Sequence, residues 1–463
     1  MGGGLLQLVA YGAQDVYLTG NPQITFFKVV YRRHTNFAME AIQQTFSGIP
    51  DFGNTVYCQI SRNGDLINRA YLEVTLPAMT ASNMFVNYIG LRLLKSVTIE
   101  IGGQQIDKHY SDWLYIWNEL SLPIGKRYAW EKMVGADQDI TSDTSSTGVT
   151  LFVPLEFWFC RTIGLALPLI ALQYHEVKLK IEFESHNNCI YQIGTGPTAN
   201  DTIDPSTTYK LQKANLWVDY IFLDTDERRK FAQLSHEYLI EQLQFTGSES
   251  LTTGTSGTST RVKLNFNHPC KELVWVAKYA SSTTRNHWYN YTVKADGSFL
   301  TGLQKPSAIL AATTLADLGS NILASSNAGG IAENNSFITK LVYNVEPGFS
   351  ANSTNPFERC LLQLNGNDRF AQRDGSYFNY VQPFQHHTNI PANQGINVYS
   401  FALKPEEHQP SGTLNMSRID TAVLAVDTKK ITSGTLSGVI NIYATNYNVL
   451  RILSGMGGLA YSN

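Results

Sequence analysis

The stretch Glu176–Phe183, EVKLKIEF, decides the fold class because apolar and charged residues alternate strictly along it. Alternation with a period of two is typical of a β-strand with one buried face and one wet face. The same period recurs in five further stretches: Tyr71–Leu76, Val97–Ile101, Val262–Phe266, Leu362–Leu364 and Val439–Ile442. Helical periodicity is confined to Lys108–Leu120 and Thr225–Leu234. Many short strands with long polar connections predict an all-β fold of sandwiches or barrels.

Length and composition bound the organisation of the chain. A single core rarely grows beyond about 250–300 residues, so 463 residues predict two domains. A hydrophobic content of 43% with 24 Tyr, 22 Phe and 7 Trp excludes a mainly disordered chain. The net charge of −3 argues against a protein whose main task is to neutralise nucleic acid. Charged residues make up only 16%, which suits strands, turns and extensive contact with neighbouring molecules.

Membrane and export signals are not expected. The longest apolar run, Ile163–Leu172, contains Pro168 and is far shorter than the roughly 20 residues that span a bilayer. Lys28 is the first basic residue, so the basic start of a secretory signal is missing. The five cysteines are odd in number and far apart, which favours free thiols in a reducing compartment over a disulfide framework.

Four polar stretches are predicted to be loops. Pro123–Thr150, His186–Lys213 and Ser281–Pro356 are rich in small polar residues, Gly or Pro, and the third is unusually long for a connection inside a domain. Gly247–Thr260 is of low complexity and is expected to be flexible.

Three short segments of the first half have echoes, in the same order, in the second half. Each pair is weak alone; together they favour a tandem duplication of one β-domain, although strands of similar composition would also resemble each other. The pairs are Met39–Gln43 with Ile240–Gln244, Ile99–Gly103 with Leu362–Gly366, and Asp219-Tyr220 with Asn441–Tyr443, the last followed by Arg228 and Arg451 respectively. The joint is expected near Asp224–His236, where charge interrupts the strand pattern.

Motifs for enzymatic chemistry fail on inspection, so no catalytic residue, metal or cofactor is predicted. His175-Glu176 begins like a zinc-protease motif, but Leu179 stands where the second His is needed. There is no His-x-His pair, and the adjacent His386-His387 could not easily share an ion from one strand. The glycine patterns at Gly194 and Gly455 are interpreted as glycine loops rather than nucleotide sites.

Two basic clusters and five sequons complete the candidate sites. Arg32-Arg33-His34 and Arg228-Arg229-Lys230 fit salt bridges between subunits better than nucleic-acid binding. The candidate glycosylation sites are Asn290, Asn334 and Asn352, which we expect to be exposed in the long loop, and with lower priority Asn200 and Asn415. Without a signal peptide, the default expectation is that the sequons are unmodified.

Longer motifs resemble one known family over most of the chain. They include VAYGAQDVYLTGNPQITFFKVVYRRHTNFA (9–38), IEIGGQQIDKHYSDW (99–113), GLALPLIALQYHEVKL (164–179), WVDYIFLDTDERRKFAQLSHEYLIEQLQFTGSE (217–249), LQLNGNDRFAQRDGSYFNYVQPF (362–384) and NIYATNYNVLRILSGMGGLAYSN (441–463). These stretches resemble the major capsid proteins of large icosahedral double-stranded DNA viruses, closest to the algal-virus branch. The resemblance is weak across the three long loops.

The resemblance implies a double jelly roll, that is, two tandem eight-stranded antiparallel sandwiches. It implies an N-terminal arm at 1–26 that lies at the base of the capsomer, a first roll at 27–223, a joint at 224–236 and a second roll at 237–463, whose long loop would form an outer tower. It also implies a homotrimer, since three chains of two similar rolls present six similar lobes and can tile a shell face.

The leading hypothesis is therefore a structural shell protein of the virion, assembled in the host cytoplasm. Its expected partners are copies of itself, minor capsid proteins and an internal viral membrane or its proteins, with no specific nucleic acid. The alternative is a lectin-like sandwich that attaches to host glycans, motivated by the aromatic content and the long loops. A metal-dependent jelly-roll enzyme is the third hypothesis, and the missing His-x-His pair argues against it.

Overall fold

The computed structural model describes Ala10, Gly12–Ala13 and residues 34–79, 83–136, 148–192, 209–283, 287–294, 353–432 and 434–461. The chain divides into two compact units, Met1–Phe37 and Ala38–Asn463. Most of the first unit, and with it most of the predicted arm, lies outside the described residues. In the described ranges, no helix is both long enough and apolar enough to cross a membrane.

The strands before residue 224 form two four-stranded sheets and smaller additions. One sheet has the order β1-β11-β3-β7 and the other has the order β2-β9-β5-β6; every pairing whose register is resolved is antiparallel. β8 pairs with the first residues of β3, and β4 pairs with β10. The strands are β1 Phe37–Gln44, β2 Thr55–Gln59, β3 Leu66–Thr75, β4 Asn83–Phe85, β5 Leu94–Ile101, β6 Gln104–Tyr110, β7 Thr150–Pro154, β8 Leu167–Pro168, β9 Val177–Phe183, β10 Ile190–Gln192 and β11 Lys213–Leu223. The helices are α3 Ile89–Leu93, α4 Ser111–Ser121, α5 Ile124–Val134, α7 Trp158–Arg161, η1 Ile163–Leu165 and η2 His186–Asn188.

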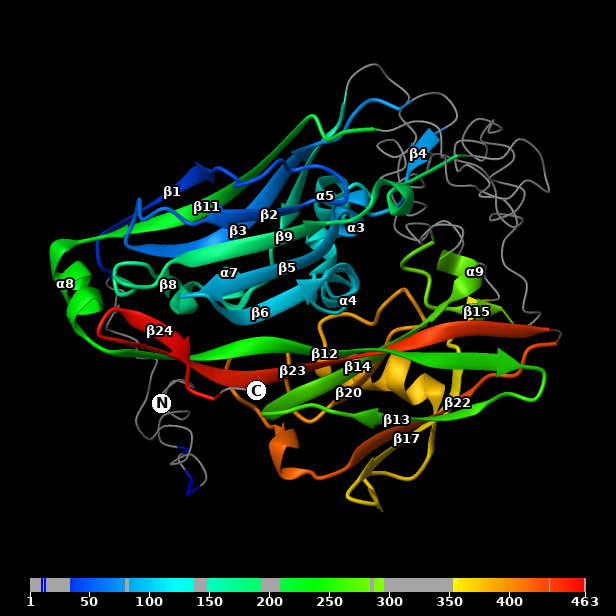
Figure 1. The fold of residues 1–463 in the computed structure, drawn as a ribbon. Helices are drawn as coiled ribbons and strands as arrows, with labels where there is room; N and C mark the ends of the chain where they lie inside the picture. The colour runs from blue at the N-terminus through cyan, green and yellow to red at the C-terminus, as the bar shows by residue number, and fades with distance from the viewer. Residues whose placement is uncertain are drawn as a thin grey trace. The chain divides into compact units, whose positions relative to one another are not determined.

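After the charged helix α8 (Thr225–Gln233), the second half repeats this plan (Figure 1). Its sheets have the orders β12-β23-β14-β20 and β13-β22-β17-β18. The strands are β12 His236–Gly254, β13 Ser259–Leu264, β14 Pro269–Tyr279, β15 Val293–Lys294, β16 Ser353–Thr354, β17 Phe357–Leu364, β18 Asn367–Asp368, β19 Arg373–Asp374, β20 Asn397–Ser400, β21 Leu414–Asn415, β22 Ala422–Thr428, β23 Thr435–Leu453 and β24 Met456–Leu459. The helical segments are α9 Ala280–Thr283, η3 Tyr377–Val381, α13 Gln382–His386 and η4 Met416–Arg418.

The two halves share one topology. Each half has eight strands in its two main sheets, in the sheet orders given above. When these eight are numbered 1 to 8 along the chain, both halves place strands 1-8-3-6 in one sheet and strands 2-7-4-5 in the other. This order is that of a jelly roll, so the predicted double jelly roll is confirmed. The three sequence echoes fall on matching strands: β1 with β12, β5 with β17, and β11 with β23.

One turn shows why the second echo exists. The hairpin between β5 and β6 turns at Gly102 and Gly103, with φ of 58° and 82°. The matching hairpin between β17 and β18 turns at Asn365 and Gly366, with φ of 50° and 79°. Two consecutive positive φ angles define the type I′ turn, which favours Asn-Gly or Gly-Gly because a side chain clashes there.

The second roll has a sheet that is buried on both faces. Along β14, Leu273, Trp275 and Ala277 belong to the core of the second roll, whereas Val274 and Val276 belong to the core that fills the first roll. A strand buried on both faces reads as a continuous apolar run rather than an alternating one. Tyr443 and Leu450 of β23 also join the first core, so the two rolls pack through a shared apolar interface.

Two loop predictions were wrong. Pro123–Thr150 contains α5, whose Trp130 and Val134 are buried against the first core. Gly247–Thr260 was expected to be flexible, but β12 extends through its first part to Gly254 and pairs there with β23. Ladder pairing with a neighbouring strand compensates for the weak propensity of Ser, Thr and Gly.

Candidate functional site

Asp112 is the centre of a buried contact between the rolls. It lies in the first turn of α4, where the helix dipole favours a carboxylate. Its Oδ2 accepts a hydrogen bond from Lys278 Nζ of β14 at 2.6 Å, and its Oδ1 accepts one from the Tyr291 hydroxyl at 3.1 Å. Burial and the nearby Asp112 raise the pKa of Tyr291 well above its usual range, so the hydroxyl remains a donor. One side chain of the first roll therefore fixes two elements of the second.

Aromatic rings fill the space around Asp112. Tyr115 of α4 stacks on Tyr289 with ring centroids 4.6 Å apart, and Trp113 packs on Tyr443 at 5.6 Å. The hydroxyl groups of Ser111 and Tyr289 share a hydrogen bond of 2.6 Å. Aromatic pairs add to the free energy already gained from buried area, which stabilises the interface between the rolls.

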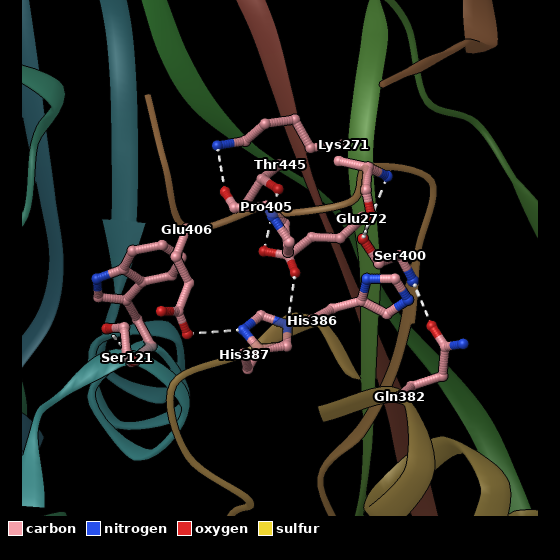
Figure 2. A network of polar contacts seen from close by, with 12 residues as sticks. Ser121, Lys271, Glu272, Gln382, His386, His387, Ser400, Pro405, Glu406 and Thr445 are labelled. Carbon is pink, nitrogen blue, oxygen red and sulfur yellow. Dashed lines mark hydrogen bonds and ion pairs between the residues drawn. The ribbon is translucent and has the colours of Figure 1, made fainter. Parts of the chain in front are cut away.

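A second polar network crosses the same interface at Glu241 of β12. Its carboxylate binds Arg161 of the first roll at 2.9 Å and Lys271 of the second at 2.8 Å. Burial alone would raise the pKa of Glu241, but His408, Lys271 and Arg161 outweigh it and hold the pKa at about 2. Lys271 Nζ also donates to the Pro405 carbonyl at 2.6 Å (Figure 2).

Figure 2 shows the continuation of this network at His387, whose ring lies between two carboxylates. Nε2 is 3.0 Å from Glu272 Oε2, and Nδ1 is 2.9 Å from Glu406 Oε1. The side chains of His387 and Glu272 are both 0% exposed. Ion pairing with the two carboxylates outweighs burial, which would lower the pKa of His387, and raises it from 6.5 to about 9.

The segment that carries His387 reaches across to the first roll. Asn389 donates its backbone N–H to the Leu120 carbonyl at 2.9 Å, and its side chain donates to the Leu122 carbonyl at the end of α4. We call residues 383–390 the strap. Hydrogen bonds thus join the strap to the chain that leads into α5.

Exposed apolar side chains gather on these joined segments. We call them the seam patch: Ile124 at the start of α5, Tyr380, Phe384 and Ile390 on or beside the strap, and Leu403, whose carbonyl contacts His386 Nδ1 at 3.0 Å. Phe384 is 74% exposed and Leu403 is 71% exposed. Large exposed apolar groups that are close together are typical of protein–protein contacts.

The C-terminal hairpin, β23 and β24, packs on the first roll through His175. Its Nδ1 lies 2.8 Å from the Gly457 carbonyl oxygen and 3.1 Å from the Gly457 nitrogen. The glycine pattern at Gly455 is the type I′ turn of this hairpin, with Ser454 and Gly455 at φ of 51° and 81°.

The sequons and basic clusters are only partly described. Asn290 is 6% exposed, so the expectation that it is exposed is wrong; its Oδ1 accepts hydrogen bonds from the Thr292 backbone and hydroxyl, which folds the segment inward. Asn415 is exposed, and Asn200, Asn334 and Asn352 lie outside the described residues. Arg228 pairs with Asp65 at 3.0 Å, whereas Arg32 and Arg33 are not described.

The arrangement described so far offers contact surfaces. Across the described ranges, no group of three or more His, Cys, Asp or Glu side chains is placed to hold a metal ion. Asp112 was not predicted from its sequence context, and His387 was considered there only as a metal ligand. A signal for the buried network was present in Lys271-Glu272, a charged pair at the start of the apolar run of β14.

Taken together, two jelly rolls with one topology and a shared apolar core define the class as a double jelly-roll protein. Two family models match the chain: major capsid protein N-terminus over residues 25–224 and large eukaryotic DNA virus major capsid protein over residues 227–458. The chain belongs to the major capsid proteins of large eukaryotic DNA viruses.

The similar proteins agree with this assignment. The major capsid proteins of Phaeocystis pouchetii virus and Pyramimonas orientalis virus are each 46% identical to this chain, with 100% of both chains covered. A quasi-atomic model of the PBCV-1 virus capsid matches with a TM-score of 0.72 and 40% identity, covering 95% of this chain and 100% of the other. The predicted family and its algal-virus branch are confirmed, and nothing in these matches supports the lectin-like alternative.

Proposed function

We propose that the chain assembles into homotrimers that tile the icosahedral shell. The observation that carries the proposal is the repeated strand order, because two similar rolls per chain give a trimer six similar lobes. The fold of the PBCV-1 capsid structure, at 40% identity, supports it. The division into an arm at 1–26, rolls at 27–223 and 237–463 and a joint at 224–236 is part of the same proposal.

The seam patch is one side of the contact within the trimer. A ring of identical chains uses a heterologous contact, in which one surface of each copy meets a different surface of the next. Phe384 and Leu403 protrude beside the interface between the rolls, so a neighbouring copy that covers them would contact both rolls at once. Contacts between trimers are smaller and more polar in this proposal, so that misplaced trimers can dissociate and rebind. Assembly in the host cytoplasm, and binding to minor capsid proteins and an internal membrane or its proteins, complete the proposal.

Replacing Phe384 by serine tests the patch, and Gln385→Ser on the same exposed turn is the matched control. A buried Phe contributes about 2 kcal/mol, and a trimer has three equivalent contacts, so the loss is about 6 kcal/mol or roughly 10⁴ in the association constant. Sedimentation equilibrium should show the Phe384 variant dissociating at a concentration where the control is trimeric. Equal trimer stability of the two variants would remove the seam patch from the contact.

A further inference from the structure

Both ring nitrogens of His387 lie close to carboxylate oxygens. Nδ1 shares a hydrogen bond of 2.9 Å with Glu406 Oε1, whereas Nε2 lies 3.0 Å from Glu272 Oε2 in an ion pair that is not aligned as a hydrogen bond. Neither nitrogen has another polar partner among the described residues. A neutral imidazole has one N–H and one lone pair, so one nitrogen would point a lone pair at a carboxylate. An imidazolium presents an N–H to both.

The charges on every side of the ring are accounted for. Glu272 comes from β14, and Glu406 comes from the loop after β20. Beyond them, Lys271 is directed to Pro405 and Glu241, while Glu241 also binds Arg161 and lies 3.5 Å from His408. His386 points to the Leu403 carbonyl instead. The positive charge that Glu272 meets directly is therefore that of His387.

Glu272 depends on this charge. Burial alone would raise the pKa of Glu272, but the pairing with His387 outweighs it and holds the pKa below the usual value. Its Oε1 accepts a hydrogen bond from the Thr445 hydroxyl at 3.2 Å, and its Oε2 has His387 as its neighbour. A buried carboxylate whose cation is lost carries a large desolvation penalty, so the local structure must open to water.

The position of His387 turns this local event into a conformational one. His387 follows the end of α13 and lies two residues before Asn389, which binds the first roll at Leu120 and Leu122. Phe384 and Ile390 of the seam patch are on the same short segment. Movement of the ring therefore moves both the contact to the first roll and the apolar patch.

We propose that His387 makes a pH-dependent contact that holds the strap in place. As an imidazolium between Glu272 and Glu406 it fixes the strap across the interface between the rolls, and its deprotonation at alkaline pH releases the strap together with the residues of the seam patch on it. The proposal stands on the geometry within one chain and does not rest on the trimer.

The direction of the pH effect follows from the raised pKa. A group whose pKa is higher in the folded state than in the unfolded state stabilises the fold fully below the unfolded value. For His387 this stabilisation is present below about 6.5 and is lost as the pH rises through about 9.

Hydrogen exchange of the full chain, followed by mass spectrometry between about pH 7 and about pH 10, tests the proposal. After correction for the intrinsic pH dependence of exchange, the wild-type strap peptide should lose protection about tenfold or more, with a midpoint near pH 9. His387→Gln should leave the strap unprotected throughout, with no midpoint. His386→Gln, the matched control next to it, should behave like the wild type. Retained protection of β9 in each variant shows that the chain is folded.

A second variant, Glu406→Gln, tests the proposal independently if His387→Gln does not fold. Glu406→Gln removes the carboxylate that is partly exposed, at 17%, and should move the midpoint toward the ordinary histidine value. A wild-type strap that stays protected to the end of the pH range would overturn the proposal. A His387→Gln strap as well protected as the wild type, or a midpoint that Glu406→Gln does not move, would overturn it as well.

Discussion

Replacing Asp112 by alanine removes the carboxylate that binds the second roll to α4. Lys278 then loses its ion pair at 2.5 Å, and Tyr291 loses its acceptor at 3.1 Å. Breaking a fully buried pair costs about 3–5 kcal/mol, and the side-chain exposures of 11% and 13% reduce this somewhat. The lost tyrosine hydrogen bond adds about 1 kcal/mol. We expect the free energy of unfolding to fall by about 3–5 kcal/mol, a large share of the stability of an ordinary protein.

Urea denaturation at fixed protein concentration, followed by tryptophan fluorescence, measures this loss. Asp420→Ala, at an exposed position of the second roll, is the matched control and should change the free energy by less than about 0.5 kcal/mol. Adding Lys278→Met to Asp112→Ala should restore about 1–3 kcal/mol relative to the sum of the single changes, because the cation that faced the lost carboxylate is removed together with it. An Asp112 variant as stable as the Asp420 control would refute the inference that this contact holds the rolls together.

Three further predictions concern turns, acid and thiols. Gly103→Ala should lower the free energy of unfolding by about 1 kcal/mol through backbone strain alone, since φ is +82° and no atom lies within 4 Å of the new Cβ. Gly102→Ala should lower it further, because its Cβ would clash with the ring of His175; thermal denaturation of both variants tests this order. The depressed pKa of Glu241 contributes stability that is present above about pH 4.5 and is lost as the pH falls toward 2. Glu241→Gln should therefore be less stable than the wild type at neutral pH but lose less stability in acid. Parallel plots of the free energy of unfolding against pH for the two proteins would contradict this. Burial raises the pKa of Cys58 and Cys270 to about 12, so iodoacetamide should react slowly with these thiols in the native chain. All five cysteines should be labelled only after denaturation, and rapid labelling of Cys58 or Cys270 in the native chain would be inconsistent with their burial.

Much of the fold could be predicted because a strand with one buried face and one solvent-exposed face has an alternating pattern of apolar and polar residues. The alternation in Glu176–Phe183 corresponds to β9, and the charged stretch Thr225–Leu234 corresponds to α8. Gly247–Gly254 was misread because Ser, Thr and Gly give no pattern of their own, and the partner that orders them is β23, far along the chain. α5 was missed because only one side of it is buried, and its exposed side carries Ile124 and Tyr128.

The contacts between the rolls could not be predicted from the sequence. Asp112 and Tyr291 are 179 residues apart, and only the fold places them together. The contacts of His387 could not be predicted for the same reason, since the carboxylates that it meets belong to Glu272 of β14 and Glu406 of a later loop. The second echo, by contrast, was visible in the sequence because both rolls have a type I′ turn there, which favours Gly-Gly or Asn-Gly.

The mass of the assembled protein in solution tests the central claim most directly. Two rolls that present similar lobes, with an exposed patch beside their interface, predict a stable homotrimer. Native mass spectrometry at micromolar concentration should therefore give three times 51.6 kDa, about 155 kDa. A persistent species of 51.6 kDa under the same conditions would contradict the account.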